Sequence, residues 1–208
     1  MADLPGHIFV VDDDEGVRQA FRRLLTSAGF AVTALDSGAE LLGFDPQEPI
    51  CIVLDHDMPG LTGLELQRSM APDSAVSIIF VTGHADVPLS VAAMKAGAVD
   101  FLTKPVEADR LIDAVQRGLA RSQSIIAQRV ERQVFLDRVA LLTTREREVA
   151  ALVIQGLLNK QIAATIGTAE KTVKVHRARL MEKLGVSSVA ELARLAERNQ
   201  TLASRPQA

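Results

Sequence analysis

The chain of 208 residues contains no tryptophan, no tyrosine and a single cysteine, Cys51. Without these aromatic residues, stacking of large side chains on the bases of single-stranded nucleic acid is not expected. A lone cysteine excludes a disulfide framework within the chain. Because Cys51 lies inside an apolar run, we expect it to be a small buried hydrophobic residue and not a redox group.

Long apolar segments are also lacking. No uninterrupted apolar run approaches the roughly 20 residues that a membrane-spanning helix needs. The first residues do not show the basic-then-apolar pattern of a secretory signal. We therefore expect a cytoplasmic protein without a membrane partner, and 208 residues with 48% hydrophobic content are sufficient for one or two domains with real cores.

Charge is distributed unevenly along the chain. Residues 1–105 carry 6 basic and 15 acidic side chains, whereas residues 143–208 carry 11 basic and 6 acidic ones. The segment between them is nearly balanced, with 6 basic and 5 acidic side chains. This asymmetry indicates a cation-dependent front module joined to a back module that binds a polyanion, although a solvated surface of chance composition would also produce it.

In the front half, apolar runs alternate with amphipathic helical patterns. Such alternation is typical of an α/β fold, a parallel sheet with helices on both faces, and we expect five strands in flavodoxin-like order. Gly29 and Gly97 lie where two helices should end. The predicted strands are 7–11, 30–34, 50–54, 76–81 and 98–102, and the predicted helices are 15–28, 37–42, 63–69, 86–96 and one that begins near 107.

Chemically active side chains follow four of these strands. Asp12-Asp13-Asp14 comes after the first strand, Asp55 after the third, Thr82 after the fourth and Lys104 after the fifth. The carboxyl ends of parallel strands meet at one edge of the sheet, where ligands bind in such folds. Taken singly, each residue has an ordinary alternative: a strand-end cap, a solvated loop, or a β-branched strand residue. Asp14 is expected to be a loop residue or a helix-start charge.

Together these motifs resemble the receiver domain of two-component response regulators, over nearly all of residues 1–120. The motifs are Asp12-Asp13, Asp55-x-x-Met58-Pro59, Thr82-Gly83 and Lys104-Pro105, and the segment from Phe80 to His84 is similar to the FixJ subgroup. The resemblance implies that Asp55 accepts a phosphoryl group from a sensor histidine kinase. It also implies a Mg²⁺ ion on Asp12, Asp13, Asp55 and the backbone carbonyl of Asp57.

The resemblance assigns further roles around the phosphoryl group. Lys104 and Thr82 would bind its oxygens, and Phe101 would rotate inward as the switch, unless it is plain core. Asp57 departs from the family, whose members often carry a neutral or basic side chain there. Its carboxylate could repel the acyl phosphate, bind a water or change the phosphate's lifetime. His56 and His84 could bind metal or take part in phosphotransfer, but we expect both to be solvent-exposed loop residues.

A long helix is predicted from 107 to about 140, because no Gly or Pro interrupts the pattern between Gly118 and Leu142. We assign 121–141 as a helical linker. Ser122, Arg129 and Gln133 interrupt its apolar stripe. Coiled-coil dimerisation and packing on the chain's own domains therefore remain alternatives. The resemblance implies phosphorylation-promoted dimerisation through about 86–118.

Four short helices are predicted in the back module, 142–200, followed by a disordered tail, 201–208. Thr143 with Glu146 and Ser188 with Glu191 have capping-box spacing, and Thr168 is expected to cap the third helix after a tight turn at Gly167. This arrangement is typical of a helix-turn-helix bundle. Basic residues are expected to face outward along the third helix at positions 171, 174, 177 and 183.

The pattern Leu142-Thr143-x-Arg145-Glu146, with Lys171-Thr172-Val173-Lys174-Val175-His176-Arg177 further on, resembles the LuxR/FixJ DNA-binding domain. By that resemblance, major-groove contacts come from Lys174, Val175 and Ala178, and backbone contacts from Lys160, Lys171, Thr172, His176 and Arg177. His176 could instead brace the helix. Ala178 is small, so base reading there is reduced to a methyl contact or lost.

These observations predict a DNA-binding response regulator that is not an enzyme in its own right. It would dimerise when phosphorylated, bind an inverted-repeat promoter and activate transcription by RNA polymerase. Two alternatives remain. One is an orphan regulator that works without phosphorylation. The other is a haloacid-dehalogenase-like phosphatase, suggested by Asp55-x-Asp57 followed by Thr82 and Lys104, although its acidic pair would follow the lysine and not precede it.

Overall fold

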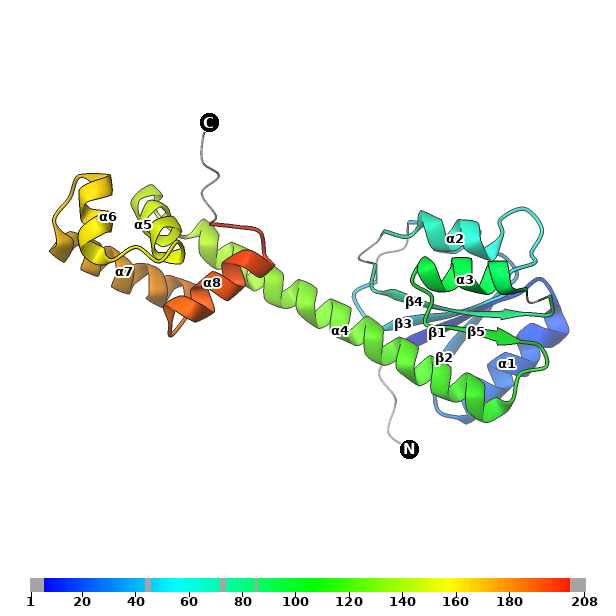
Figure 1. Cartoon of the computed structure of the whole chain (residues 1–208). Coiled ribbons are helices and arrows are strands. Elements are labelled where there is room, and N and C mark those ends of the chain that lie inside the picture. Colours follow the sequence, from blue (N-terminus) through cyan, green and yellow to red (C-terminus); the bar gives the residue numbers. More distant parts are fainter. Residues whose placement is uncertain (1–5, 44–45, 72–73, 85, 203–208) are drawn as a thin grey trace. The chain divides into compact units, whose positions relative to one another are not determined.

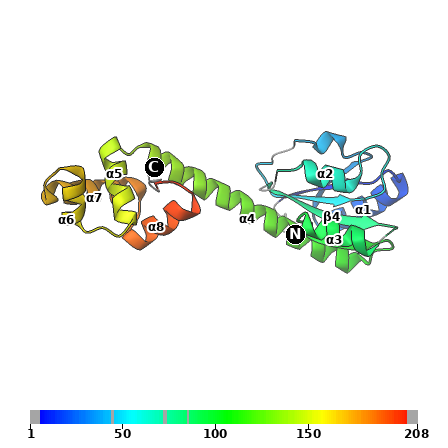
Figure 2. The ribbon, with the colours of Figure 1, turned by 45° about the horizontal axis from the view of Figure 1, so that its top comes forward.

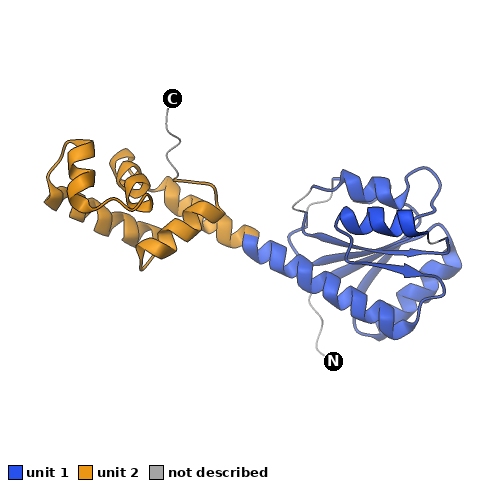
Figure 3. Ribbon diagram, in the orientation of Figure 1, with its two compact units in different colours: residues 1–128 blue, residues 129–208 orange. Residues whose placement is uncertain are grey.

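The computed structural model describes residues 6–43, 46–71, 74–84 and 86–202. It divides into two compact units, 1–128 and 129–208, which Figure 3 shows in different colours. We call them the front unit and the back unit and describe each by itself. The boundary falls within one long helix, α4 (Ala108–Ala140), which confirms the continuous helix predicted there. Our division at 120 and 141 stays a prediction.

The front unit contains a five-stranded parallel sheet in the order β2-β1-β3-β4-β5 (Figure 1). This confirms the predicted flavodoxin-like order. Strands β3 and β4 are buried along their whole length because helices cover both faces of the sheet. The strands are β1 (His7–Val11), β2 (Ala31–Leu35), β3 (Ile50–Leu54), β4 (Val76–Thr82) and β5 (Asp100–Thr103).

Two helical layers enclose the sheet, as Figure 1 shows. One core packs α1 (Glu15–Ser27) and the first part of α4 on one face, and the other packs α2 (Gly63–Ser69) and α3 (Val87–Lys95) on the opposite face. The side chain of Asp14 caps α1 by accepting a hydrogen bond from the Val17 N–H (3.1 Å). Asp14 is therefore the helix-start residue that the sequence suggested.

The prediction of a helix at 37–42 was wrong. Only a single 3₁₀ turn, η1 (Ala39–Leu41), forms in this segment. Gly43 follows it with a left-handed φ of 72°. At Gly38, a Cβ atom would lie 2.7 Å from Leu66 of α2. The segment is thus held against α2 between two glycines and is too short to continue as an α-helix.

Ser122 explains why the apolar stripe of α4 is interrupted. Its side chain is fully buried, accepts a hydrogen bond from the Ile50 N–H (2.8 Å) and donates one to the Ala75 carbonyl. The serine therefore fixes α4 to the start of β3, and α4 packs on the front unit this far. Beyond it, Val130 and Val134 are exposed. The structure does not test coiled-coil dimerisation of this later part.

Cys51 of β3 is fully buried, and burial raises the pKa of its thiol to about 12. A Cβ atom at Gly118 of α4 would lie 2.7 Å from its sulfur, so helix and strand touch here. The prediction of an inert core cysteine fits both observations.

The back unit consists of the end of α4 and four further helices, visible in Figure 2. Thr143 and Glu146 form the predicted capping box. The predicted Thr168 cap was wrong. Ala169 is the N-cap residue of α7 and, being an alanine, gives no side-chain hydrogen bond. Thr168 lies one residue earlier, in the turn, where its backbone N–H donates to the Ala163 carbonyl. These helices are α5 (Thr144–Ile154), α6 (Asn159–Ile166), α7 (Glu170–Leu184) and α8 (Val189–Arg198).

The predicted disordered tail falls partly on described residues. The Thr201 N–H donates to the Ala196 carbonyl (3.0 Å), and Leu202 packs against the core of the back unit. Residues 203–208 lie outside the described part of the chain. In the described ranges, no helix combines the length and the apolar character needed to cross a membrane.

Candidate functional site

Three carboxylates meet at the carboxyl edge of the sheet. Strands β1 and β3 pair in register up to Val11 and Leu54, so Asp12 and Asp55 leave adjacent strand ends side by side. Both are buried, with 3% and 6% of their surfaces exposed, and Asp13 is exposed beside them. One ligand oxygen from each of the three lies within 4.8 Å of the others. The structure therefore brings together the acidic cluster that the sequence predicted.

Lys104 provides the positive charge in this cluster. Its Nζ lies 2.5 Å from Asp12 Oδ2 and 3.3 Å from Asp55 Oδ1. The backbone N–H of Lys104 donates to the Thr82 carbonyl (2.9 Å). Burial raises the pKa of Asp55, although the Lys104 ammonium acts in the opposite direction. For Lys104, burial alone would lower the pKa, but the hydrogen bond and charge of Asp12 outweigh it and the pKa is raised.

The donor set suits a hard divalent cation. Mg²⁺ prefers a few carboxylates completed by water and phosphate oxygens, and the cluster offers carboxylates from Asp12, Asp13 and Asp55 without a thiol or imidazole. A point charge such as Lys104 is also suited to a phosphoryl oxygen. The arrangement can hold a cation, a nucleophilic carboxylate and an ammonium at one edge.

Thr82 ends β4 and is fully buried. Its hydroxyl donates to Asp57 Oδ2 (3.2 Å) and accepts from the His84 N–H (3.1 Å). The family resemblance assigned Thr82 to a phosphoryl oxygen and the Asp57 backbone carbonyl to Mg²⁺, and for the Asp57 carboxylate it left open repulsion of the phosphate, binding of a water or a changed phosphate lifetime. The bond between the two side chains was not expected.

The two loop histidines differ. The His84 side chain is 94% exposed, as predicted, whereas only 18% of the His56 side chain is exposed. The exposed-loop prediction for His56 was therefore wrong. Its ring lies 6.4 Å from that of Phe80, measured between centroids, and its carbonyl accepts a hydrogen bond from Gly63 at the start of α2. The backbone of His56 is thus tied to the start of α2, and its ring lies toward Phe80 and away from solvent.

Phe101 lies on β5 next to Phe80 of β4 in the strand register. The two rings stack with centroids 6.0 Å apart and an interplanar angle of 26°. Phe101 is half-buried against the core beneath α2 and α3. This placement is compatible with the switch role and with the plain-core role.

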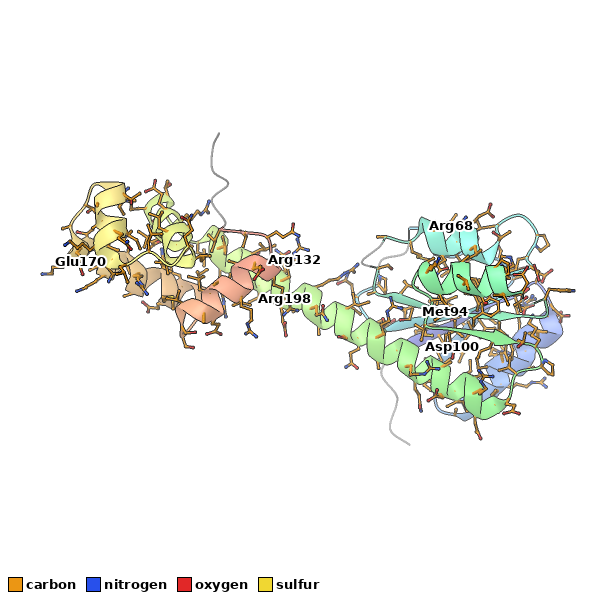
Figure 4. All side chains as sticks on the ribbon, in the orientation of Figure 1. Arg68, Met94, Asp100, Arg132, Glu170 and Arg198 are labelled. Atoms are coloured by element: carbon orange, nitrogen blue, oxygen red, sulfur yellow. The ribbon has the colours of Figure 1, made fainter. Side chains whose placement is uncertain are left out.

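One face of α7 is exposed and basic. Lys171, Lys174, Val175 and Ala178 are exposed and have the 3, 4 and 7 spacing of a single helix face. Val173, Leu180 and Leu184 are buried on the other side. Lys174 lies 3.4 Å from Glu170, which Figure 4 labels at the start of α7. Lys160 and Thr172 are also exposed, and His176 is half-buried.

Two basic residues of α7 make contacts within the back unit. Arg177 Nη1 donates to Asn159 Oδ1 (2.8 Å) and so ties α7 to α6. Lys183 Nζ lies 2.6 Å from Glu146 Oε2 at the start of α5. The prediction that Lys183 faces outward was therefore wrong, because the buried carboxylate of Glu146 holds it.

Comparison with known proteins agrees with both units. Residues 8–116 match the family model described as response regulator receiver domain, and residues 140–196 match bacterial regulatory proteins, luxR family. The chain belongs to the two-component response regulators.

Several relatives of this response regulator are similar over most of their length. The transcriptional regulatory protein FixJ of Bradyrhizobium diazoefficiens is 44% identical over 195 residues, which cover 93% of this chain and 95% of that protein. FixJ of Azorhizobium caulinodans is also 44% identical, over 93% of this chain and 92% of that protein. The solved structure of the response regulator StyR has a TM-score of 0.78 at 44% identity and covers 94% of this chain and 100% of that chain.

Two residues that support the response-regulator site were missed in the sequence. A Cβ atom at Gly63 would lie 2.8 Å from the Asp55 carbonyl oxygen and 2.8 Å from the Phe80 ring, so only glycine fits without a shift. Arg18 Nη1 donates to the Asp12 carbonyl (2.7 Å) and fixes the acidic loop. Gly63 had no signal beyond its place at a helix start, and Arg18 is one of several arginines on α1.

Proposed function

We propose that a cognate sensor histidine kinase phosphorylates Asp55, and that the phosphorylated protein dimerises and activates transcription by RNA polymerase at an inverted-repeat promoter in the cytoplasm. The observation that carries this proposal is the buried Asp12–Lys104–Asp55 arrangement in one chain with the exposed basic face of α7. We retain 1–120, 121–141 and 142–200 as the receiver, linker and DNA-binding segments.

Phosphoryl transfer follows from the side chains at the edge of the sheet. An Asp55 carboxylate oxygen attacks phosphorus, an acyl phosphate bond forms, and the bond to the kinase imidazole breaks as the imidazole leaves. Asp12, Asp13, Asp55 and the Asp57 carbonyl would hold Mg²⁺, which when bound offsets negative charge. Lys104 would exchange one carboxylate partner for a phosphoryl oxygen, and Thr82 would donate its hydroxyl to another. Phe101 would then rotate inward as the switch.

Exposed apolar residues on α3 support the proposed dimer surface. Val87, Val91 and Met94 are exposed with the spacing of one helix face. Arg117 Nη2 lies 2.7 Å from Asp100, which Figure 4 labels near Met94. This surface lies within the segment 86–118 that the family resemblance suggested.

Phosphodonor-dependent DNA binding tests the proposal. When Mg²⁺ and a small phosphodonor are added, the wild-type chain should form dimers and bind inverted-repeat DNA at least about tenfold more tightly than without the phosphodonor. The Asp55→Asn variant should show neither dimer formation nor tighter DNA binding. Sedimentation measures the oligomeric state, and binding to a library of DNA sites measures the DNA affinity. Equal binding by both proteins under all conditions would contradict the proposal and leave a phosphorylation-independent regulator. Sustained turnover of a phosphomonoester would favour the phosphatase.

Lys174→Ala tests the proposed DNA face of α7. Loss of one cation beside phosphates and base edges should weaken DNA binding about tenfold and reduce the slope of log affinity against log salt by about one. Arg194→Ala is the matched control, because Arg194 is an exposed basic residue of the same unit that lies on α8 and not on α7. Equal losses in the two variants would show that only net charge matters and would remove Lys174 from the interface.

A further inference from the structure

Two acceptors compete for the hydroxyl proton of Thr82 at the proposed phosphorylation site: the Asp57 carboxylate in the structure and a phosphoryl oxygen under the proposed function. We infer that the Asp57 side chain is a positioning residue that holds Thr82 in its resting place, so that Asp57 must release Thr82 when Asp55 is phosphorylated. This inference rests on the proposed function of Asp55. It concerns the Asp57 carboxylate, for which the sequence left three effects open: repulsion of the acyl phosphate, binding of a water, or a changed lifetime of the phosphate.

The single hydroxyl proton of Thr82 is already used in the resting structure. A threonine hydroxyl carries a single proton. That proton points to Asp57 Oδ2 (3.2 Å), while the His84 N–H occupies an acceptor position of the same oxygen (3.1 Å). Thr82 is fully buried, so no water takes a share of its proton at the protein surface.

Phosphorylation therefore sets up a competition. If Thr82 donates to a phosphoryl oxygen, it cannot also donate to Asp57, because it has no second proton. The phosphoryl group adds about −1.5 to −2 charges, and the Asp57 carboxylate is like-charged. Half of the Asp57 side chain is exposed, which screens that repulsion. The lost hydrogen bond, and not the charge alone, is thus the larger expected effect, and it biases the chain toward the resting state.

Substitutions of Asp57 can separate the hydrogen bond from the charge. Asp57→Ala removes both, whereas Asp57→Asn removes the charge and keeps an oxygen that can accept from Thr82. Either change leaves the backbone carbonyl proposed for Mg²⁺ in place. The probe is beryllofluoride, a non-covalent analogue of the phosphoryl group, titrated calorimetrically into the full chain in the presence of Mg²⁺. Titration of Mg²⁺ alone gives each variant's metal affinity and separates that effect.

Asp57→Ala should bind beryllofluoride about 2- to 10-fold more tightly than the wild type, the range expected for one net hydrogen bond, and Asp57→Asn should stay close to the wild type. In a Thr82→Ala background, Asp57→Ala should add nothing, because the effect passes through the Thr82 hydroxyl.

Three results would overturn the inference: no tightening in Asp57→Ala, the same tightening in Asp57→Asn, or an undiminished effect without the Thr82 hydroxyl. A wild-type chain that binds no beryllofluoride would instead contradict the proposed function of Asp55. Because the wild type reports on the phosphoryl site and the variants report on Asp57, the two failures are distinguishable.

Discussion

A Lys104→Met variant should lose about 3 kcal/mol of front-unit stability in the absence of Mg²⁺ and regain most of it when Mg²⁺ is added. Lys104 Nζ lies 2.5 Å from Asp12 and 3.3 Å from Asp55, and both carboxylates are buried. Removing the ammonium leaves two like charges without a counter-ion, and breaking a buried pair typically costs 3–5 kcal/mol. About a quarter of the Lys104 side chain is exposed, which places the cost at the lower end.

Acidification should reduce the difference in front-unit stability between Lys104→Met and the wild type. The pKa of Asp55 is raised by burial even with Lys104 present, and loss of the ammonium removes the main influence that lowers it. A carboxylate whose folded pKa is raised opposes folding above that pKa, and its opposition fades as the pH falls. The pKa of Asp55 should be raised further in the variant, so the variant should regain more stability toward acidic pH than the wild type does.

Calorimetry or circular dichroism should follow this unfolding, because the chain has no Trp or Tyr to report by fluorescence. Lys95→Met, at the exposed end of α3, is the matched control and should change little. The transition of the back unit is an internal control, since Lys104 belongs to the front unit. Unchanged stability of Lys104→Met without Mg²⁺, or equal stabilisation of both proteins by Mg²⁺, would contradict the expectation.

Sequence reasoning succeeded where a residue's environment depends on its own strand or helix. Strands β3 and β4 are apolar throughout because both faces are covered, and such runs stand out from amphipathic segments. The strand order was predicted from the alternation of strands and helices. Given that order, the residues that follow the strands were expected at one edge of the sheet, namely Asp12, Asp55, Thr82 and Lys104. The capping box of Thr143 and Glu146 was found because its partners lie three residues apart.

Partners that are distant along the chain were not found. Thr82 and Asp57 are 25 residues apart, Lys183 and Glu146 are 37 apart, and Ser122 and Ile50 are 72 apart. Periodicity tells which face of a helix is polar but does not say which polar group meets another. Ser122 looked like a break in an apolar stripe for this reason, and Lys183 looked like one more outward lysine.

The contact between Glu146 and Lys183 leads to the second large effect. We expect Glu146→Gln to destabilise the back unit by about 2 kcal/mol at neutral pH, the size of a hydrogen bond to a charged group. Glu146 is buried, lies 2.6 Å from Lys183 Nζ and accepts a hydrogen bond from the Thr143 N–H (2.9 Å). Glutamine can keep the bond to Thr143, so the loss reports on the ion pair with Lys183.

The pH dependence of this loss has a definite sign. The hydrogen bond from Lys183 and the capping bonds of Thr143 lower the pKa of Glu146 from 4.5 to about 2. A carboxylate with a lowered folded pKa stabilises the fold fully above the unfolded value, and this stabilisation disappears as the pH falls through the folded value. The wild type and Glu146→Gln should therefore differ most above about pH 4.5 and converge near pH 2.

Urea unfolding followed by circular dichroism across this pH range measures the difference. Glu148→Gln is the matched control, since Glu148 lies two residues further on α5 and also pairs with a cation, Arg145, at 2.6 Å. Unlike Glu146, it has 46% of its side chain exposed. Exposed pairs contribute at most about 1 kcal/mol, so this variant should change little at any pH. Equal losses in the two variants, or a Glu146→Gln difference that persists at pH 2, would show that burial of the carboxylate at the start of α5 does not strengthen its bond to α7.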